Sequence, residues 1–397
     1  MGYRGFYDAS KDQIKVICGE GCLASLPAEV KACGGKAFLI SDPVVMRETD
    51  LVEKVSNLLG SNLVAVFDET IPHTPRKVIL KAADLARSSH PDCLISLGGG
   101  STTDTAKAVR LALWMGISDT AGFDEVQTKL KAEHVKCPGA PVPQIALPTT
   151  LVGAEYTSGM GVTNEATHAK QVFVHPLLQC RNILLDPELT RYTPPVLWLS
   201  TGVKSLEHAI ARLSAPERHP IVDGTAALAV HIIGEELRNS FKSPDDLGAR
   251  SRLQVGSWLS QFGSESCSGM RMGLSHALGR QIGSVSGVPH GLSSCVILPL
   301  SMDYNASACQ AGFTIVAQAL GVKTDGLTVD AIGHSAADAI RFLIAELNLP
   351  SRLRDIGVSR DALPLISERT MHDWSIGENP CRINSADEVL ALLERAW

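Results

Sequence analysis

The segment 94–107, which reads LISLGGGSTTDTAK, limits the possible folds of this chain more than any other. The apolar run 93–97 predicts a buried strand, and the residues from Asp104 onward have apolar side chains at helical spacing. Three glycines and then hydroxyl residues stand between them, which predicts a strand, a tight turn and a helix N-terminus. Glycine lets the backbone approach a phosphate, and the N–H groups of a first helical turn attract anions. A plain turn needs only one glycine, so the segment favours phosphate binding, although it matches neither G-x-G-x-x-G nor the P-loop.

Predicted strands alternate with predicted helices over the first hundred residues. The strands are expected at 15–18, 36–41, 62–67, 93–97 and 144–147, and the helices at 22–32, 52–59 and 76–89. Such alternation predicts a parallel sheet with helices on both faces. In sheets of this kind ligands bind beyond the carboxyl ends of the strands, which is where the triple glycine is expected.

Polar side chains follow two other predicted strands. Asp42 comes directly after the strand at 36–41, where a carboxylate can either bind a ribose or cap a helix or turn. Both interpretations stay open at this point. If Asp42 holds a ribose, its charge disfavours a 2′-phosphate and favours NAD over NADP. Thr149 and Thr150 follow the strand at 144–147, where their hydroxyls can hydrogen-bond a cofactor.

The pattern changes in the second half of the chain. Segment 159–175 alternates like a hairpin, and from Asp186 onward long amphipathic helical patterns dominate, for example 225–240, 248–262 and 330–347. We therefore predict an α/β dinucleotide-binding domain over residues 1–186. An all-helical domain for substrate binding and catalysis is predicted over residues 187–397.

Composition excludes several classes of protein. Hydrophobic residues make up 45% and charged residues 20% of the chain, as expected for an ordered globular protein. A formal charge of −6 without a basic stripe argues against nucleic acid as a partner, and no apolar stretch is long enough to span a membrane. The ten cysteines form no CxxC pair and no apolar signal core precedes them, so we expect reduced thiols and a cytoplasmic protein that acts on a small molecule.

Six segments together resemble the iron-containing alcohol dehydrogenase superfamily, and within it the maleylacetate reductase branch. In chain order they are GGGSTTDTAKA (98–108), LPTTLVGAEYT (147–157), LLDPELT (184–190), STGVKSLEHAI (200–210), GLSHALG (273–279) and PHGLSSCVILP (289–299). The resemblance implies the fold that dehydroquinate synthase shares with the iron alcohol dehydrogenases: an α/β dinucleotide-binding domain with a parallel sheet, followed by an all-α domain, with hydride transfer in the cleft between. It also implies NAD(H) or NADP(H) as cofactor and a homodimer.

The resemblance also assigns cofactor contacts to residues of this chain. The positions implied at the pyrophosphate are Gly98, Gly99, Gly100, Ser101 and Asp104. The positions implied along the rest of the cofactor are Thr149, Thr150, Thr157 and Lys170.

The chain departs from the family at the metal site. In the metal-dependent members one aspartate and three histidines bind a divalent cation, but here Lys204 stands at the aspartate position and Met272 at that of the second histidine. His208 and His290 are retained. An ammonium repels a divalent cation and a thioether is a weak ligand for iron(II) or zinc, so we expect no metal. Glu207, one position before His208, is expected to point away from this helix face.

Lys204 and His208 are expected to share one helix face, because they are spaced i and i+4. We hypothesise that the Lys204 ammonium replaces the charge of the metal and hydrogen-bonds a developing alkoxide or a substrate carboxylate. In the alternative, Lys204 turns to solvent and the site is degenerate. His276 is expected to have a pKa near neutrality and to supply the proton, or else to be a core histidine bonded to a backbone carbonyl. His208 and His290 are alternative proton donors.

The sequence thus predicts a metal-independent, NAD(P)H-dependent reductase of a carbonyl or a related C=N or C=C group, similar to maleylacetate reductase. Maleylacetate is the substrate that the resemblance suggests, and a specialised biosynthetic reductase is equally admissible. A lyase or cyclase like dehydroquinate synthase is one alternative, but Lys204 counts against a reaction that calls for a metal and a carboxylate-rich cleft. A non-catalytic homologue that binds a dinucleotide is another, and the glycine segment fits it equally well.

Overall fold

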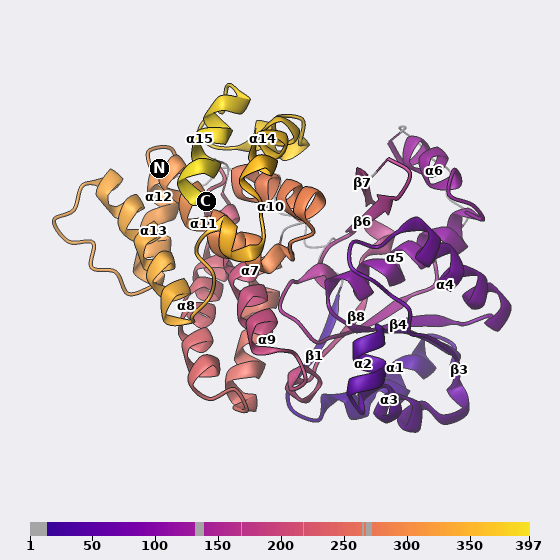
Figure 1. Cartoon of the computed structure of the whole chain (residues 1–397). Helices are drawn as coiled ribbons and strands as arrows, with labels where there is room; N and C mark the ends of the chain where they lie inside the picture. The colour runs from indigo at the N-terminus through magenta and orange to yellow at the C-terminus, as the bar shows by residue number, and fades with distance from the viewer. Residues whose placement is uncertain (1–13, 132–138, 168, 217, 264–265, 267–271) are drawn as a thin grey trace. The chain divides into compact units, whose positions relative to one another are not determined.

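A computed structural model describes residues 14–131, 139–167, 169–216, 218–263, 266 and 272–397. The chain forms two compact units that meet in sequence between Thr193 and Pro194 (Figure 1). The domain boundary expected near Asp186 stays a prediction. Over the described residues, every helix is too short or too polar to cross a bilayer.

The first unit is built on a parallel sheet, which the alternating pattern predicted. In the described part of the chain this sheet has six strands. In spatial order they are β1 (Lys15–Cys18), β8 (Asn182–Leu185), β5 (Gln144–Pro148), β4 (Cys93–Gly98), β2 (Ala37–Ile40) and β3 (Leu63–Phe67). All neighbouring pairs are parallel. The strands expected from the sequence are therefore confirmed, with ends that differ by at most one residue.

Helices cover both faces of this sheet. The α-helices are α1 (Leu26–Ala32), α2 (Pro43–Glu48), α3 (Leu51–Leu59), α4 (Arg76–Ser89), α5 (Gly100–Met115) and α6 (Gly122–Lys131). Short 3-10 helices are η2 (Cys22–Ser25), η3 (Gly60–Asn62), η4 (Ala154–Tyr156), η5 (Pro176–Leu178) and η6 (Pro187–Thr190). Figure 1 shows α4 and α5 on one side of the sheet and α1 to α3 on the other.

Alternation along the central strands produces two separate cores. Phe38 and Ile40 of β2 pack into the core beneath α4 and α5, whereas Ala37 and Leu39 pack into the core with α1 and α3. Successive side chains of a strand point to opposite faces, so a strand that is covered on both faces is apolar throughout. This explains why β2 reads as an unbroken hydrophobic run and why Ser96 is the one polar residue of β4.

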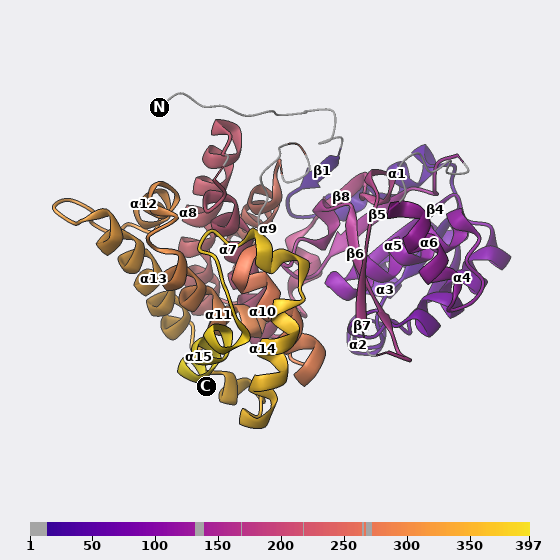
Figure 2. The same ribbon diagram turned by 90° about the horizontal axis from the view of Figure 1, so that it is seen from above.

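The predicted hairpin is also present. Strands β6 (Gly159–Asn164) and β7 (Ala169–Val174) pair antiparallel and form a separate two-stranded sheet (Figure 2). Strand β6 packs against α5, so the hairpin lies next to the helix that begins at the triple glycine.

The second unit is all-helical, as predicted. Its α-helices are α7 (Pro195–Leu213), α8 (Pro220–Lys242), α9 (Leu247–Gln261), α10 (Gly273–Ser286), α11 (His290–Asn305), α12 (Gln310–Ala319), α13 (Val329–Glu346), α14 (Leu363–Met371) and α15 (Ala386–Ala396). Its 3-10 helices are η7 (Leu353–Ile356), η8 (Arg360–Ala362) and η9 (Trp374–Glu378). Helix α7 is buried along most of its length and packs against α8, α9 and α11, so polar side chains on α7 are enclosed by other helices.

Candidate active site

The triple glycine lies at the carboxyl end of β4 and begins α5. Gly98 has a φ of 152°, and a Cβ built there would lie 2.6 Å from Thr102 Oγ1. A Cβ on Gly99 would lie 3.2 Å from Thr150 Cγ2, and one on Gly100 would lie 3.2 Å from Val152 Cγ1. A side chain at Gly98 would clash, and one at Gly99 or Gly100 would have to push its neighbour aside. The three glycines therefore keep the backbone uncovered at the start of a long helix. These features fit the phosphates of a dinucleotide.

Asp42 lies beside this turn. The chain runs from β2 outward to β3 and then returns to β4 on the other side of β2, so the strand order reverses between β2 and β4. Ligands of open α/β sheets bind at such a reversal.

Asp42 Oδ1 accepts hydrogen bonds from the backbone N–H groups of Val44 at 3.0 Å and Val45 at 2.9 Å, which confirms the helix-capping interpretation. Its Oδ2 lies 3.2 Å from where a Cβ on Gly98 would stand. Ribose binding by this oxygen stays a prediction.

The other residues expected at the cofactor lie close to the same turn. The Thr149 backbone N–H donates to the Gly98 carbonyl at 3.0 Å, and Ser101 lies in the first turn of α5. Asp104 Oδ2 accepts from the Gly161 N–H at 3.2 Å. A Cβ on Gly161 would lie 2.0 Å from Lys170 Cε, so glycine is needed for Lys170 to cross the hairpin there. Burial raises the pKa of Asp104, and Lys107 and Lys170 oppose that shift.

Lys107 is a residue that the sequence reasoning missed. Its side chain is fully buried (0% exposed), and Nζ donates to the backbone carbonyls of Ala154 and Thr157 at 2.6 Å and of Gly159 at 3.0 Å. It therefore fixes the segment that connects β5 to the hairpin, including Thr157. The sequence does indicate this role, because Lys107 stands between Ala106 and Ala108 in an apolar helix. A lysine in such a place must find hydrogen-bond acceptors inside the protein.

In the helical unit, Lys204 lies inside the protein on α7. Its side chain is only 10% exposed, and Nζ donates to Glu207 Oε2 at 2.8 Å. The alternative in which Lys204 turns to solvent is therefore wrong. Burial lowers the pKa of Lys204 and Glu207 offsets part of that shift, because its carboxylate favours the ammonium form.

Glu207 contradicts the expectation that it points away from this face. Besides Lys204, its Oε2 accepts a hydrogen bond from Ser294 Oγ of α11, and its Oε1 lies 3.2 Å from His276 Nδ1 of α10. Residues spaced i and i+3 are neighbours on a helix, so Glu207 can face Lys204 even though it precedes His208. Burial favours the neutral acid, but His276 and Lys204 outweigh it and hold the pKa of the Glu207 carboxyl well below its usual range.

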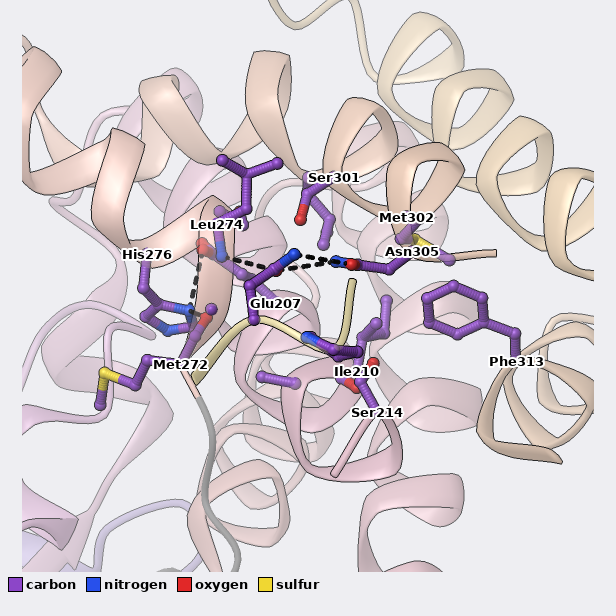
Figure 3. A pocket seen from close by; sticks show the side chains of 16 residues that line it. Glu207, Ile210, Ser214, Met272, Leu274, His276, Ser301, Met302, Asn305 and Phe313 are labelled. Atoms are coloured by element: carbon purple, nitrogen blue, oxygen red, sulfur yellow. Dashed lines mark hydrogen bonds and ion pairs between the residues drawn. The ribbon is translucent and has the colours of Figure 1, made fainter. Parts of the chain in front are cut away.

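His276 lies across from Glu207 on α10. Its Nδ1 donates to the backbone carbonyl of Met272 at 2.9 Å (Figure 3), and its buried Nε2 has no hydrogen-bond partner among the described residues. Burial lowers the pKa of His276 to about 3 despite the nearby Glu207. The expected pKa near neutrality is therefore wrong, and the expected backbone contact of a core histidine is present.

The two other histidines expected at the site occupy different positions. The His208 ring stacks on that of His276 with centroids 5.3 Å apart, and the amide nitrogen of Gln261 donates to His208 Nδ1 at 2.8 Å. Burial lowers the pKa of His208 well below its usual range. His290 is the first residue of α11, beside Gly283 of α10. The structure thus brings Lys204, His208 and His276 together around Glu207.

Arg280 is a second cation that the sequence reasoning missed. It lies on α10, and its Nη2 pairs with Asp373 Oδ1 at 2.5 Å, while its guanidinium stacks on Trp374. Its Nη1 donates to the Met272 sulfur at 3.6 Å. Its charge also contributes to lowering the pKa of Lys204 and His276.

The residues at the position of the family's metal site do not fit a divalent cation. Within the described ranges, histidine, cysteine, aspartate and glutamate side chains form no group of three that could hold a metal. In the cluster formed by Lys204, Glu207, His208 and His276, the Glu207 carboxylate binds the Lys204 ammonium. The Met272 sulfur accepts a hydrogen bond from Arg280. A cation would have to displace two positive charges to reach these atoms.

A small pocket of the helical unit opens beside this cluster. Figure 3 shows Glu207, Met272 and His276 on its wall. The remaining labelled residues are Ile210, Ser214, Leu274, Ser301, Met302, Asn305 and Phe313. The cavity measures about 30 Å³, which leaves room for about two water molecules. This pocket by itself therefore offers polar groups next to Glu207 but no room for a cofactor.

Comparison with models of known protein families shows to which family the chain belongs. The model described as iron-containing alcohol dehydrogenase matches residues 14–187, and the model of the C-terminal domain of the Fe-containing alcohol dehydrogenase family matches residues 198–397. The chain belongs to the iron-containing alcohol dehydrogenase family. The resemblance found in the six sequence segments is thereby confirmed.

Individual members of the iron-containing alcohol dehydrogenase family match over nearly the whole chain. Lactaldehyde reductase of Escherichia coli K12 is 28% identical over 383 residues, covering 96% of this chain and 97% of that protein. Maleylacetate reductase of Burkholderia cepacia is 29% identical over 386 residues, covering 96% and 95%. The crystal structure of maleylacetate reductase from Agrobacterium tumefaciens aligns with a TM-score of 0.79 at 26% identity, covering 100% and 98%. These relatives are reductases, and this chain is an oxidoreductase of the same family.

Proposed function

We propose that the protein is an NAD(P)H-dependent reductase of small carbonyl compounds that works without a metal ion. The observation that carries the proposal is the buried Lys204, held by Glu207 at 2.8 Å at the position where the family motif has a carboxylate. A fixed positive charge can stabilise a developing alkoxide as a metal ion would. The reductases among the relatives support the direction of the reaction.

The α/β unit is proposed to bind the dinucleotide. The glycine turn at 98–100 and the first turn of α5 would receive the pyrophosphate, with Ser101 and Asp104 beside it. Thr149, Thr150, Thr157 and Lys170 are proposed along the cofactor. Asp42 favours NAD(H) over NADP(H), since its Oδ2 lies beside Gly98 and would repel a 2′-phosphate. When bound, the reduced nicotinamide supplies a hydride to the carbonyl carbon.

Lys204 is proposed to act on the carbonyl oxygen. Its ammonium donates a hydrogen bond as negative charge develops there and then transfers its proton to the alkoxide, which gives the alcohol. The neutral amine regains a proton from water. Burial strengthens this interaction because little solvent screens it, and the lowered pKa makes the ammonium a better acid than an exposed lysine.

His276 is proposed as a hydrogen-bond acceptor instead of the proton source. With a pKa of about 3 its ring is neutral near pH 7, and the hydrogen on Nδ1 faces Met272. Its Nε2 can accept a hydrogen bond from a substrate hydroxyl. His208 is also neutral and supports the His276 ring by stacking, while a role for His290 as donor stays a prediction.

The function is tested by incubating the purified protein with NADH or NADPH and a panel of carbonyl compounds that includes maleylacetate and lactaldehyde. We expect cofactor oxidation with at least one compound, and equal rates before and after dialysis against EDTA. Adding iron(II) or zinc should not raise the rate. Loss of activity with EDTA and its recovery with metal would contradict metal independence. Cofactor binding without oxidation by any compound would favour a non-catalytic homologue.

Replacing Gly98 by alanine is expected to weaken NADH binding roughly tenfold, or about 1.4 kcal/mol. The added Cβ would lie 2.6 Å from Thr102 Oγ1, and a φ of 152° strains any side chain, so the turn must shift. Fluorescence titration measures the change. Gly116→Ala is the matched control, because Gly116 also has positive φ and ends the same helix, but its Cβ would meet nothing. Equal affinity of both variants would contradict a cofactor-binding role of the turn.

A further inference from the structure

We propose that Glu207 is the positioning residue of this site: its carboxylate fixes the Lys204 ammonium and keeps the hydrogen of His276 on Nδ1. The consequence for catalysis rests on the function proposed above. The arrangement itself rests on contacts among described residues of the helical unit.

The carboxylate of Glu207 joins three helices. Oε2 accepts hydrogen bonds from Lys204 Nζ on the same helix, at 2.8 Å, and from Ser294 Oγ on α11. Oε1 lies 3.2 Å from Nδ1 of His276 on α10. Because Glu207 is only 1% exposed, bulk solvent does not compete for these contacts. Its two oxygens therefore set the position of Lys204 relative to His276.

Lys204, Ser294 and His276 each present a hydrogen donor to this carboxylate. An ammonium can only donate, and His276 Nδ1 must carry a hydrogen, because it lies 2.9 Å from the Met272 carbonyl oxygen, which can only accept. A carboxylate accepts through both oxygens, whereas a glutamine would direct its own N–H groups at one of the donors. The site therefore requires a negative acceptor at position 207 and not merely a polar side chain.

This arrangement separates two chemical roles. With its hydrogen on Nδ1, His276 has a lone pair on Nε2, which has no hydrogen-bond partner in the part of the chain that the structure describes. Nε2 can then accept from a hydroxyl, while Lys204 alone donates the proton. Without the carboxylate, only the Met272 carbonyl favours the hydrogen on Nδ1, so the Nε2–H form, which presents a second donor, becomes more populated. Together with the Met272 carbonyl, Glu207 thus favours Lys204 over His276 as the donor.

Nitrogen-15 NMR of histidine-labelled protein tests this directly, because the shifts distinguish a protonated from an unprotonated ring nitrogen. The His276 signals are those missing from a His276→Gln variant. We expect protonated Nδ1 and unprotonated Nε2 in the wild type. In Glu207→Gln we expect a measurable share of the Nε2–H form. We also expect kcat for carbonyl reduction to fall roughly tenfold or more, with unchanged affinity for NADH.

Two further variants separate this role from general destabilisation. Glu236→Gln alters another buried glutamate of the helical unit, which pairs with Arg252 at 2.5 Å, and should change neither the His276 signals nor kcat. Glu207→Asp keeps an acceptor and should recover part of both the Nδ1–H form and kcat.

The proposal is overturned if wild-type His276 carries its hydrogen on Nε2, or if Glu207→Gln leaves the His276 signals unchanged. If those signals respond as expected but no carbonyl compound is reduced, the reductase function fails and the positioning by Glu207 stands. The two failures are therefore distinguishable.

Discussion

Replacing Lys204 by methionine is expected to lower kcat for carbonyl reduction by about a thousandfold, because the variant loses both the charge that stabilises the alkoxide and the proposed proton donor. The affinity for NADH should not change, since the proposed dinucleotide site is formed by the other unit. Steady-state kinetics and fluorescence titration measure the two quantities separately. A Lys204→Arg variant keeps the charge but changes its shape, and it should retain more activity than the methionine variant.

Folding must be controlled in this experiment, because Lys204→Met leaves the Glu207 carboxylate buried without its cation. Removing one partner of a buried pair costs about 3–5 kcal/mol. In the double variant Lys204→Met/Glu207→Leu the unpaired charge is also removed, so stability should recover while activity stays low. Lys242→Met, at the exposed end of α8, is the matched control and should behave like the wild type. A folded Lys204→Met protein with wild-type kcat would rule out the proposed role of Lys204.

The α/β unit was predictable from sequence because its signals are local. A strand that is covered on both faces reads as a nearly continuous apolar run, as in β2 and β4. A glycine turn between strand and helix marks the edge where ligands bind. Capping by Asp42 was one of the two roles that its place after a strand and before Pro43 allowed, and the structure shows it. Ribose binding by the same carboxylate concerns an absent ligand, and therefore no local signal settles it.

The polar cluster of the helical unit was only partly predictable. The spacing of Lys204 and His208 placed both on one helix face, but the orientation of Glu207 depends on α10 and α11, which lie far away in sequence. Its contacts with His276 and Ser294 span 69 and 87 residues, and no helical periodicity contains them. The pKa of His276 was misjudged for the same reason, because burial by distant segments lowers it to about 3.

The charges of the residues around Glu207 support the proposal that this site works without a metal ion. A carboxylate binds a divalent cation best when its oxygens are free, whereas here Glu207 accepts from Lys204 and Ser294, and Asp373 accepts from Arg280. Glu207 and Asp373 are thus each paired with a cationic side chain of the protein itself. A change at position 204 alone would not restore a metal site, because Met272 would still offer only a weak thioether ligand.

Replacing Lys107 by methionine is expected to destabilise the α/β unit by about 4 kcal/mol, since each charge-assisted hydrogen bond contributes roughly 1.5–3 kcal/mol and a buried acceptor left unpaired adds a penalty. The variant would leave the carbonyls of Ala154, Thr157 and Gly159 without the Lys107 ammonium. Hydrogen exchange should rise most in residues 144–174, because Lys107 fixes the segment between β5 and the hairpin. Lys81→Met, an exposed lysine on α4, is the control and should exchange like the wild type. Unchanged protection of residues 144–174 in Lys107→Met would show that this buried ammonium does not hold the segment, and the proposed cofactor contact at Thr157 would then lose its structural support.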